Sequence, residues 1–178
     1  IQSAGEAFPR KVNLVNVWKD FNGTLELGKA TKEAGALAFK SLEAATNDLA
    51  SNKVDVLVTA PINKDTIQSA DFNFPGHTEY LAKIAGTEKV LMFLVADNLK
   101  VGIVTGHLPL KDVSAAITKE KIHEKLKLME ESLIKDFGIP RPKIAVLGLN
   151  PHAGDNGLLG TEEKETILPA VREAFDKG

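Results

Sequence analysis

Apolar residues follow two patterns along this chain, short continuous runs and longer stretches with a spacing of three and four. The continuous runs have the length of buried strands and cover residues 12–17, 54–60, 90–96, 99–105 and 144–149. The spaced stretches predict helices over residues 31–52, 63–70, 78–86, 110–117, 118–137 and 161–175. Strands that alternate with helices in this way indicate an α/β fold, with a mainly parallel sheet covered by helices on both faces.

One pair of runs departs from the parallel pattern. Residues 90–96 and 99–105 are separated by little more than Asp97-Asn98, which predicts one antiparallel hairpin within the sheet. The most regular helix begins at Thr118 and ends at Gly138, where glycine commonly terminates a helix. Five side chains form its apolar stripe: Ile122, Leu126, Met129, Leu133 and Phe137.

Composition narrows the class of protein. The 178 residues are 43% hydrophobic and 26% charged, enough for a globular domain with a real core. The net charge of −2 gives no support for nucleic acid or a membrane surface as partner. Cysteine is absent, which excludes disulfides and thiolate metal sites and fits a reducing, cytoplasmic location. No apolar run has the length of a membrane span, and no signal peptide is visible.

The segment from Lys143 to Gly160 has the densest group of candidate residues. It opens with the predicted strand 144–149, and His152 follows one residue past the turn pair Asn150-Pro151. In open α/β sheets, ligands bind at the carboxyl ends of such strands, so we expect a functional site here.

A glycine-rich loop, with Gly154, Gly157 and Gly160, then leads into a helix. Thr161 is a suitable N-cap, and Glu162 and Glu163 lie in the first turn, where acids complement the helix dipole. The loop could hold an anion through backbone N–H groups, but Asp155 would oppose a phosphate. It matches neither GxGxxG nor a Walker motif, so a purely turn-forming role for the glycines is equally consistent.

Three histidines, His77, His107 and His152, lie where a predicted strand or loop gives way to a helix. His107 and His152 each follow an apolar run, so their imidazoles meet at one edge of the sheet if the two strands are near neighbours. Imidazole is a usual zinc ligand, but two ligands do not complete a site, and a hydrogen-bonded loop role remains open for each. His123 lies beside the stripe of a charged helix, which favours a solvated or half-buried surface role.

Lys64 follows the predicted strand 54–60 and either meets a phosphate or carboxylate or extends into water. The chain contains neither a GxSxG motif nor a cysteine nucleophile, so covalent hydrolase mechanisms have little support.

The chain closely resembles the 4-hydroxythreonine-4-phosphate dehydrogenase family of pyridoxal-phosphate biosynthesis. Four motifs carry the resemblance in the family's order: VTAPINK at 58–64, GHTEYLA at 76–82, TGHLPLKDV at 105–113 and LNPHAGDNGLLGTEE at 149–163. The resemblance covers nearly the whole chain, and the last motif is the most specific. Because the chain starts at Ile1 without methionine, we expect residues 1–178 to be the central portion of a two-domain dehydrogenase, behaving mostly as one α/β domain.

The resemblance implies an isocitrate/isopropylmalate dehydrogenase-like fold and a homodimer with the active site at the interface. It implies NAD and a divalent metal (zinc, magnesium or cobalt) as cofactors. The implied reaction oxidises 4-phosphooxy-L-threonine to 2-amino-3-oxo-4-phosphooxybutanoate, which decarboxylates to 3-amino-2-oxopropyl phosphate.

By the same resemblance, His77 and Thr78 match the substrate-binding pair, with His77 also catalytic, and His107 and His152 match two metal ligands. The third metal-binding histidine is expected beyond Gly178, so this fragment alone is expected to be inactive. The NAD-contacting residues are not assigned. Gly106 stands where many relatives have threonine, a departure without expected effect.

Three other functions share these features. A paralogue would oxidise 4-phosphorylated threonate or erythronate in place of the amino acid. A non-catalytic metal- or anion-binding domain would use the same histidines without redox chemistry. A metal-dependent hydrolase would release product without forming NADH.

Overall fold

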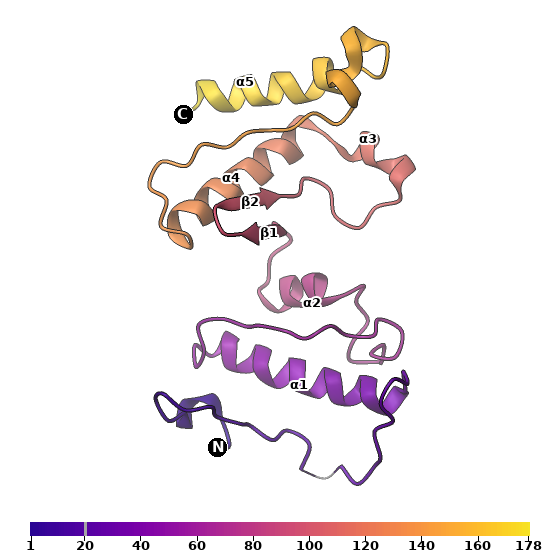
Figure 1. The fold of residues 1–178 in the computed structure, drawn as a ribbon, viewed down its shortest axis with the longest axis vertical. Coiled ribbons are helices and arrows are strands. Elements are labelled where there is room, and N and C mark those ends of the chain that lie inside the picture. The colour runs from indigo at the N-terminus through magenta and orange to yellow at the C-terminus, as the bar shows by residue number, and fades with distance from the viewer. Residues whose placement is uncertain (20) are drawn as a thin grey trace. The chain divides into compact units, whose positions relative to one another are not determined.

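Residues 1–19 and 21–178 are described by the computed structural model, in which the chain forms two units (Figure 1). Unit 1 comprises Ile1–Glu88 and unit 2 comprises Lys89–Gly178. The helices of unit 1 are η1 (Ala4–Glu6), α1 (Lys32–Ala50) and α2 (His77–Ile84). Unit 2 contains β1 (Phe93–Ala96), β2 (Leu99–Gly102), η2 (Leu110–Asp112), α3 (Val113–Ala116), α4 (Lys119–Lys135), η3 (Pro151–Gly157), η4 (Glu163–Ile167) and α5 (Leu168–Asp176).

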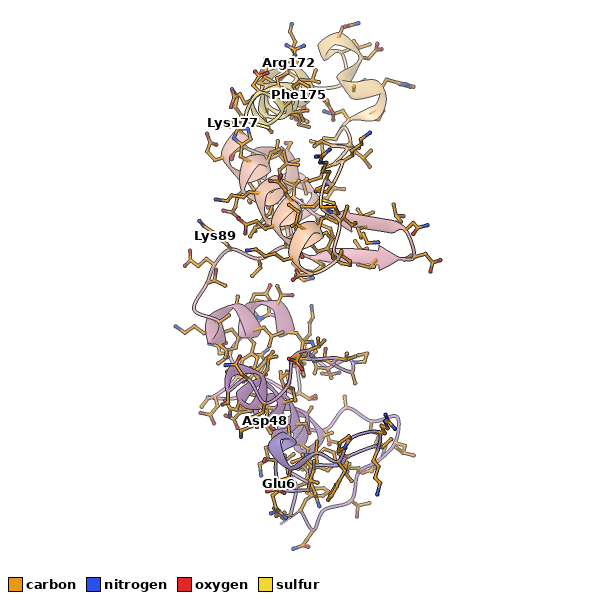
Figure 2. The ribbon with its side chains drawn as sticks, turned by 90° about the vertical axis from the view of Figure 1, so that its left-hand side faces the viewer. Glu6, Asp48, Lys89, Arg172, Phe175 and Lys177 are labelled. Carbon is orange, nitrogen blue, oxygen red and sulfur yellow. The ribbon has the colours of Figure 1, made fainter. Side chains whose placement is uncertain are left out.

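Helix α1 is the longest element of unit 1, and its start agrees with the sequence pattern. The Thr31 side chain accepts a hydrogen bond from the Ala34 N–H and so satisfies one of the free donors of the first turn. At the other end, Asp48 accepts hydrogen bonds from Lys53 and from the Ala4 N–H, which ties η1 to the end of α1 (Figure 2). The ion pair with Lys53 lowers the pKa of Asp48.

The core of unit 1 is aromatic. Phe72 is fully buried and Tyr80 nearly so, and their ring centroids lie 5.3 Å apart. Leu42 of α1 and Ile67 complete the buried cluster, with Leu57 packed against its edge. These two rings are tilted by 38°, whereas Phe39 meets both of them edge to face. Aromatic pairs of this kind add about 0.5–1.5 kcal/mol each beyond the area they bury. Because Tyr80 belongs to α2, this cluster holds α2 in place and so sets the position of the first residue of the helix, His77.

Unit 2 begins with the predicted hairpin. β1 and β2 pair antiparallel, with Ala96 opposite Leu99 and Phe93 opposite Gly102. Asp97 has a φ of 42°, the left-handed conformation that a two-residue hairpin turn requires. The hairpin prediction is therefore confirmed, although both strands are shorter than the apolar runs.

Helices α4 and α5 pack together in unit 2. Thr118 caps α4 by accepting from the Lys121 N–H, and Gly138 follows it with a φ of 66°, as predicted. Ile122 of α4 contacts a buried cluster that includes Ile167 and Ala170. Figure 2 labels three exposed residues at this end of the chain: Arg172 and Phe175 of α5, and Lys177, which directly follows the helix.

Three of the predicted strands form no sheet. In the described part of the chain, the only hydrogen-bonded sheet is the β1–β2 hairpin, and residues 12–17, 54–60 and 144–149 are assigned to no strand. Two of these runs do pack on one side, with Leu57 against the unit 1 core and Val146 against that of unit 2. A continuous apolar run indicates that its side chains are buried. It does not show which segment pairs with it, because the partner of a parallel strand is remote in sequence.

Within residues 1–19 and 21–178, none of the helices combines the length and apolar character needed to cross a membrane.

Candidate functional site

His77 is the first residue of α2 in unit 1, directly after the buried Gly76. Its half-buried side chain lines a cavity of about 340 Å³ with Trp18, Thr59 and Pro61. Thr78 follows in the first helical turn and is also half-buried. His77 thus lines a mainly apolar pocket with a few polar groups, an arrangement suited to a small polar ligand, and Thr78 is its neighbour in the chain.

Lys64 lies beside the same helix start. A methyl group on Gly76 would stand 3.7 Å from Lys64 Cε and 3.6 Å from Glu79 Oε2. The structure therefore brings the Lys64 and Glu79 side chains to Gly76, the residue that directly precedes His77 in unit 1. Sequence spacing alone did not reveal this grouping, because Lys64 and His77 are on opposite sides of the loop that carries Phe72.

His107 lies in unit 2, five residues past the end of β2. The Leu108 N–H donates to the Gly106 carbonyl at 2.9 Å, so His107 stands at the centre of a three-residue turn. Its side chain is exposed. The tight turn presents the imidazole outward from a segment that Val104 anchors to the unit 2 core.

His152 lies in an unusual backbone conformation. Five consecutive residues of η3 have positive φ: His152 (51°), Ala153 (52°), Gly154 (80°), Asp155 (45°) and Asn156 (58°). Together they form one turn with left-handed geometry, which we call the left-handed turn, 152–156. L-residues in this conformation each cost about 1–2 kcal/mol, and only glycine, asparagine and aspartate adopt it readily. The turn therefore needs contacts from elsewhere to persist.

Those contacts come from Glu163, a carboxylate that is only 3% exposed. Its Oε1 accepts from the backbone N–H groups of Leu149 (2.7 Å) and Asn150 (2.6 Å). Its Oε2 accepts from the Asn150 side-chain amide at 3.0 Å. The backbone and side-chain hydrogen bonds from Asn150 lower the pKa of Glu163 to about 2, although burial opposes the shift. The carboxylate is thus ionised and fully engaged at neutral pH.

Gly154 packs directly against this carboxylate. A methyl group on its Cα would stand 3.1 Å from Glu163 Oε2 and 2.5 Å from the Gly160 carbonyl oxygen. Gly157 and Gly160 also have positive φ, so the turn-forming interpretation of the three glycines holds. Thr161, predicted to cap the helix, instead donates from its hydroxyl to Glu165 at 3.1 Å.

Glu163 is the residue that sequence reasoning misplaced. The first-turn position of this residue predicted an acid that complements the helix dipole, whereas the structure buries it under the end of the preceding apolar run. The available signal was the distance of only thirteen residues between Asn150 and Glu163 across a glycine-rich loop. A loop of that kind can fold back on the helix start.

The two metal-ligand candidates, His107 and His152, both lie in unit 2, and the substrate candidates His77 and Thr78 lie in unit 1. Among residues 1–19 and 21–178, no three histidine, aspartate or glutamate side chains are grouped so that they could hold a metal ion. Two imidazoles provide suitable nitrogen donors but not a complete ligand set. The donor set therefore fits a metal only in part, with at least one ligand required from elsewhere.

His123 occupies the half-buried position predicted for it. Its Nε2 lies 2.9 Å from the Ala170 carbonyl oxygen of α5, and Glu173 of α5 lies 3.7 Å from the same nitrogen. The imidazole therefore joins α4 to α5, away from the candidate site residues in the chain.

Comparison with protein families gives one match, to the model of the pyridoxal phosphate biosynthetic protein PdxA, over residues 1–178. The chain is 47% identical to the 4-hydroxythreonine-4-phosphate dehydrogenase of Bacteroides thetaiotaomicron, over all of the chain and 49% of the relative. It is 42% identical to the enzyme of that name from Sulfurihydrogenibium sp., over all of the chain and 54% of the relative. The chain thus spans about half the length of the curated relatives it matches.

Solved structures that resemble this chain carry the same enzyme name as these relatives. A putative 4-hydroxythreonine-4-phosphate dehydrogenase from Salmonella typhimurium superposes with a TM-score of 0.79 at 32% identity, over all of the chain and 55% of that structure. The enzyme from Burkholderia phymatum gives a TM-score of 0.76 at 35% identity, over all of the chain and 54% of that structure. These similarities confirm the α/β fold class.

Proposed function

The chain belongs to the family of the pyridoxal phosphate biosynthetic protein PdxA, and from this premise we propose that it forms part of an NAD-dependent dehydrogenase acting on 4-phosphooxy-L-threonine. The observation that supports the proposal is the family match over every residue of the chain, together with relatives above 40% identity that are named for this activity. Because the chain spans about half of those relatives, the activity is proposed for the whole protein that contains it.

The proposed reaction would oxidise the secondary alcohol of the substrate, for which bound NAD would supply the hydride acceptor, and the resulting β-keto acid would lose carbon dioxide. His77 and Thr78 bind and orient the substrate from the start of α2. The ammonium of Lys64, which lies near Gly76, and the N-terminal end of the α2 helix dipole favour an anionic group such as the substrate phosphate. The cavity that His77 lines is large enough to shield a small substrate from bulk water.

His107 and His152 would hold a divalent metal, zinc, magnesium or cobalt, with a further ligand from beyond residue 178. A metal bound there would act as a Lewis acid toward the substrate oxygen at which negative charge develops. The role of the chain is then to hold each imidazole in place, His107 at its three-residue turn and His152 in the left-handed turn. The homodimer and the cytoplasmic location belong to the same proposal.

The deciding experiment measures NADH formation by the full-length protein with 4-phosphooxy-L-threonine and added divalent metal. The matched variants are His152→Ala and His123→Ala, because each loses one imidazole but only the first lies in the candidate site. We expect the wild type and His123→Ala to form NADH at similar rates, and His152→Ala to form it at least 100-fold more slowly. No turnover with this substrate, but turnover with 4-phosphorylated threonate or erythronate, would transfer the assignment to the paralogous dehydrogenase. Product formation without NADH would favour a hydrolase, and metal binding without either would favour a binding domain.

A further inference from the structure

The left-handed turn that carries His152 is only partly favoured by its own sequence. Gly154, Asp155 and Asn156 tolerate a positive φ, but His152 and Ala153, which open the turn, do not. Two backbone hydrogen bonds join the turn to the residues that follow it: the Leu158 N–H donates to the Asp155 carbonyl at 3.2 Å, and the Leu159 N–H donates to the Gly154 carbonyl at 3.0 Å. Such strain persists only where the surrounding structure over-determines the backbone.

The surrounding structure here centres on one side chain. Glu163 holds the residues just before the turn through the N–H groups of Leu149 and Asn150, and it contacts the middle of the turn at Gly154. The side-chain amide of Asn150 donates a third hydrogen bond to Glu163, at Oε2. The same amide group also donates to Glu162 Oε2 at 2.8 Å. Each carboxylate oxygen of Glu163 therefore faces donors from the segment it holds, which makes it a support and not a metal ligand.

Glu163 is itself held rigidly. It begins the π-helical turn η4, which continues into α5, and both are anchored by the buried side chains of Ile167 and Ala170. π-helical turns are rare and occur frequently at functional sites. The position of the carboxylate is therefore set by the unit 2 core, and the carboxylate transmits that position to the turn.

We propose that Glu163 is a positioning residue, whose carboxylate fixes the backbone at Leu149 and Asn150 and the left-handed turn after them, and so sets the direction of the His152 imidazole. The link to catalysis rests on the proposed metal-binding role of His152. The link to the turn rests only on the contacts of Glu163.

Glutamine is the informative replacement, because it keeps the shape of the side chain and removes its charge. Glu163 Oε1 accepts two N–H donors and Oε2 accepts the Asn150 amide. In Glu163→Gln, one of these two oxygens becomes an NH2 group that faces a donor, so at least one hydrogen bond is lost whichever way the amide is oriented. Glu165→Gln is the matched control, because it removes the same charge from an exposed residue two positions along the helix.

The experiment uses the full-length protein and two measurements. Hydrogen–deuterium exchange of the peptide covering residues 147–160 reports the turn, and exchange in α1 reports unaffected regions. Titration with zinc alone, and the visible spectrum of the cobalt-substituted protein, report the geometry of the site. We expect Glu163→Gln to increase exchange in residues 147–160 at least 10-fold, to weaken zinc binding about 10- to 100-fold, and to change the cobalt spectrum. Glu165→Gln should match the wild type in all three.

Wild-type exchange across residues 147–160 in Glu163→Gln would overturn the proposal. So would faster exchange with unchanged zinc affinity, provided that His152→Ala weakens zinc binding in parallel. Unchanged zinc affinity in His152→Ala would instead refute the metal role of His152, while the exchange result still decides the role of Glu163. If Glu163→Gln fails to fold, Asn150→Ala provides the second test, since it removes only the amide hydrogen bonds and should raise exchange over the same residues. Wild-type exchange in that variant would also count against the proposal.

Discussion

Gly35 of α1 lies so close to Thr66 that a methyl group on its Cα would stand 2.0 Å from the Thr66 carbonyl oxygen. Gly35 is buried, and the contact joins the first turns of α1 to the loop before Phe72 in unit 1. Glycine inside a helix normally weakens it by about 1 kcal/mol relative to alanine. Here the backbone of α1 approaches the backbone of Thr66 so closely that only glycine fits at position 35.

We therefore predict that Gly35→Ala destabilises the protein despite the higher helix propensity of alanine. Relieving a contact with a backbone atom requires α1 to shift, and such overpacking costs typically about 1–3 kcal/mol. Urea denaturation of wild type and variant measures the difference. Ala36→Gly, at the next and exposed position, should cost only about 1 kcal/mol through helix propensity. An increase in stability for Gly35→Ala would contradict the close approach of α1 to Thr66.

The lowered pKa of Glu163 predicts that the protein loses stability at low pH. The ordinary pKa of a glutamate carboxyl is about 4.5, and that of Glu163 is lowered to about 2 by its hydrogen bonds from Asn150. A lowered pKa means that the contribution to stability is fully present above about pH 4.5 and is lost as the pH falls toward 2. Glu163→Gln should therefore be less stable than wild type at pH 7 and should lose less stability between pH 4.5 and 2. Denaturation at a series of pH values tests this, and equal slopes for both proteins would disprove it.

Gly154 should tolerate no side chain. Alanine there combines a positive φ with contacts of 2.5 Å to the Gly160 carbonyl oxygen and 3.1 Å to Glu163. Gly138→Ala separates the two effects, because Gly138 has a φ of 66° but open space around its Cα. We expect Gly138→Ala to lower the free energy of unfolding by about 1 kcal/mol, the cost of left-handed strain alone. Gly154→Ala should lower it by at least about 2 kcal/mol. Thermal unfolding of both variants checks the order.

His123 should affect stability but not activity. Its imidazole lies 2.9 Å from the Ala170 carbonyl oxygen and joins α4 to α5. Loss of one such hydrogen bond costs about 0.5–1.5 kcal/mol. His123→Ala should therefore unfold at lower denaturant concentration while kcat and KM of the full-length protein remain those of the wild type. A large fall in kcat would place His123 in the site after all.

His107 should act together with His152. If both hold one metal, His107→Ala and His152→Ala should each weaken zinc binding, and the double variant should lose little more than either single one. Isothermal titration with zinc measures all three proteins. Independent, additive losses would indicate two separate sites, because residues that act on one ligand are strongly non-additive.

Local features of the fold were predictable from the sequence. The N-caps Thr31 and Thr118, the terminating Gly138 and the hairpin turn at Asp97 each depend on chemistry within a few residues. The strand pairing was not predictable in the same way. The run 144–149 reports that its side chains are apolar, but a hydrogen-bonded neighbour is a property of remote residues.

The candidate site shows the same division. His152 stands out in the sequence because it follows an apolar run, and its metal-binding role stays a prediction, as do those of His77, Thr78 and His107. Glu163 did not stand out, because an acid in the first turn of a helix is common. Its importance depends on burial beneath Asn150, which only the folded backbone establishes.

The contacts of Glu163 also bear on the order in which the chain folds. Every donor that reaches its carboxylate lies at most 14 positions earlier in the chain. Loops of about this size close within roughly a microsecond and at small entropic cost. The segment that presents His152 should therefore assemble during synthesis as soon as η4 and α5, which anchor Glu163, have left the ribosome.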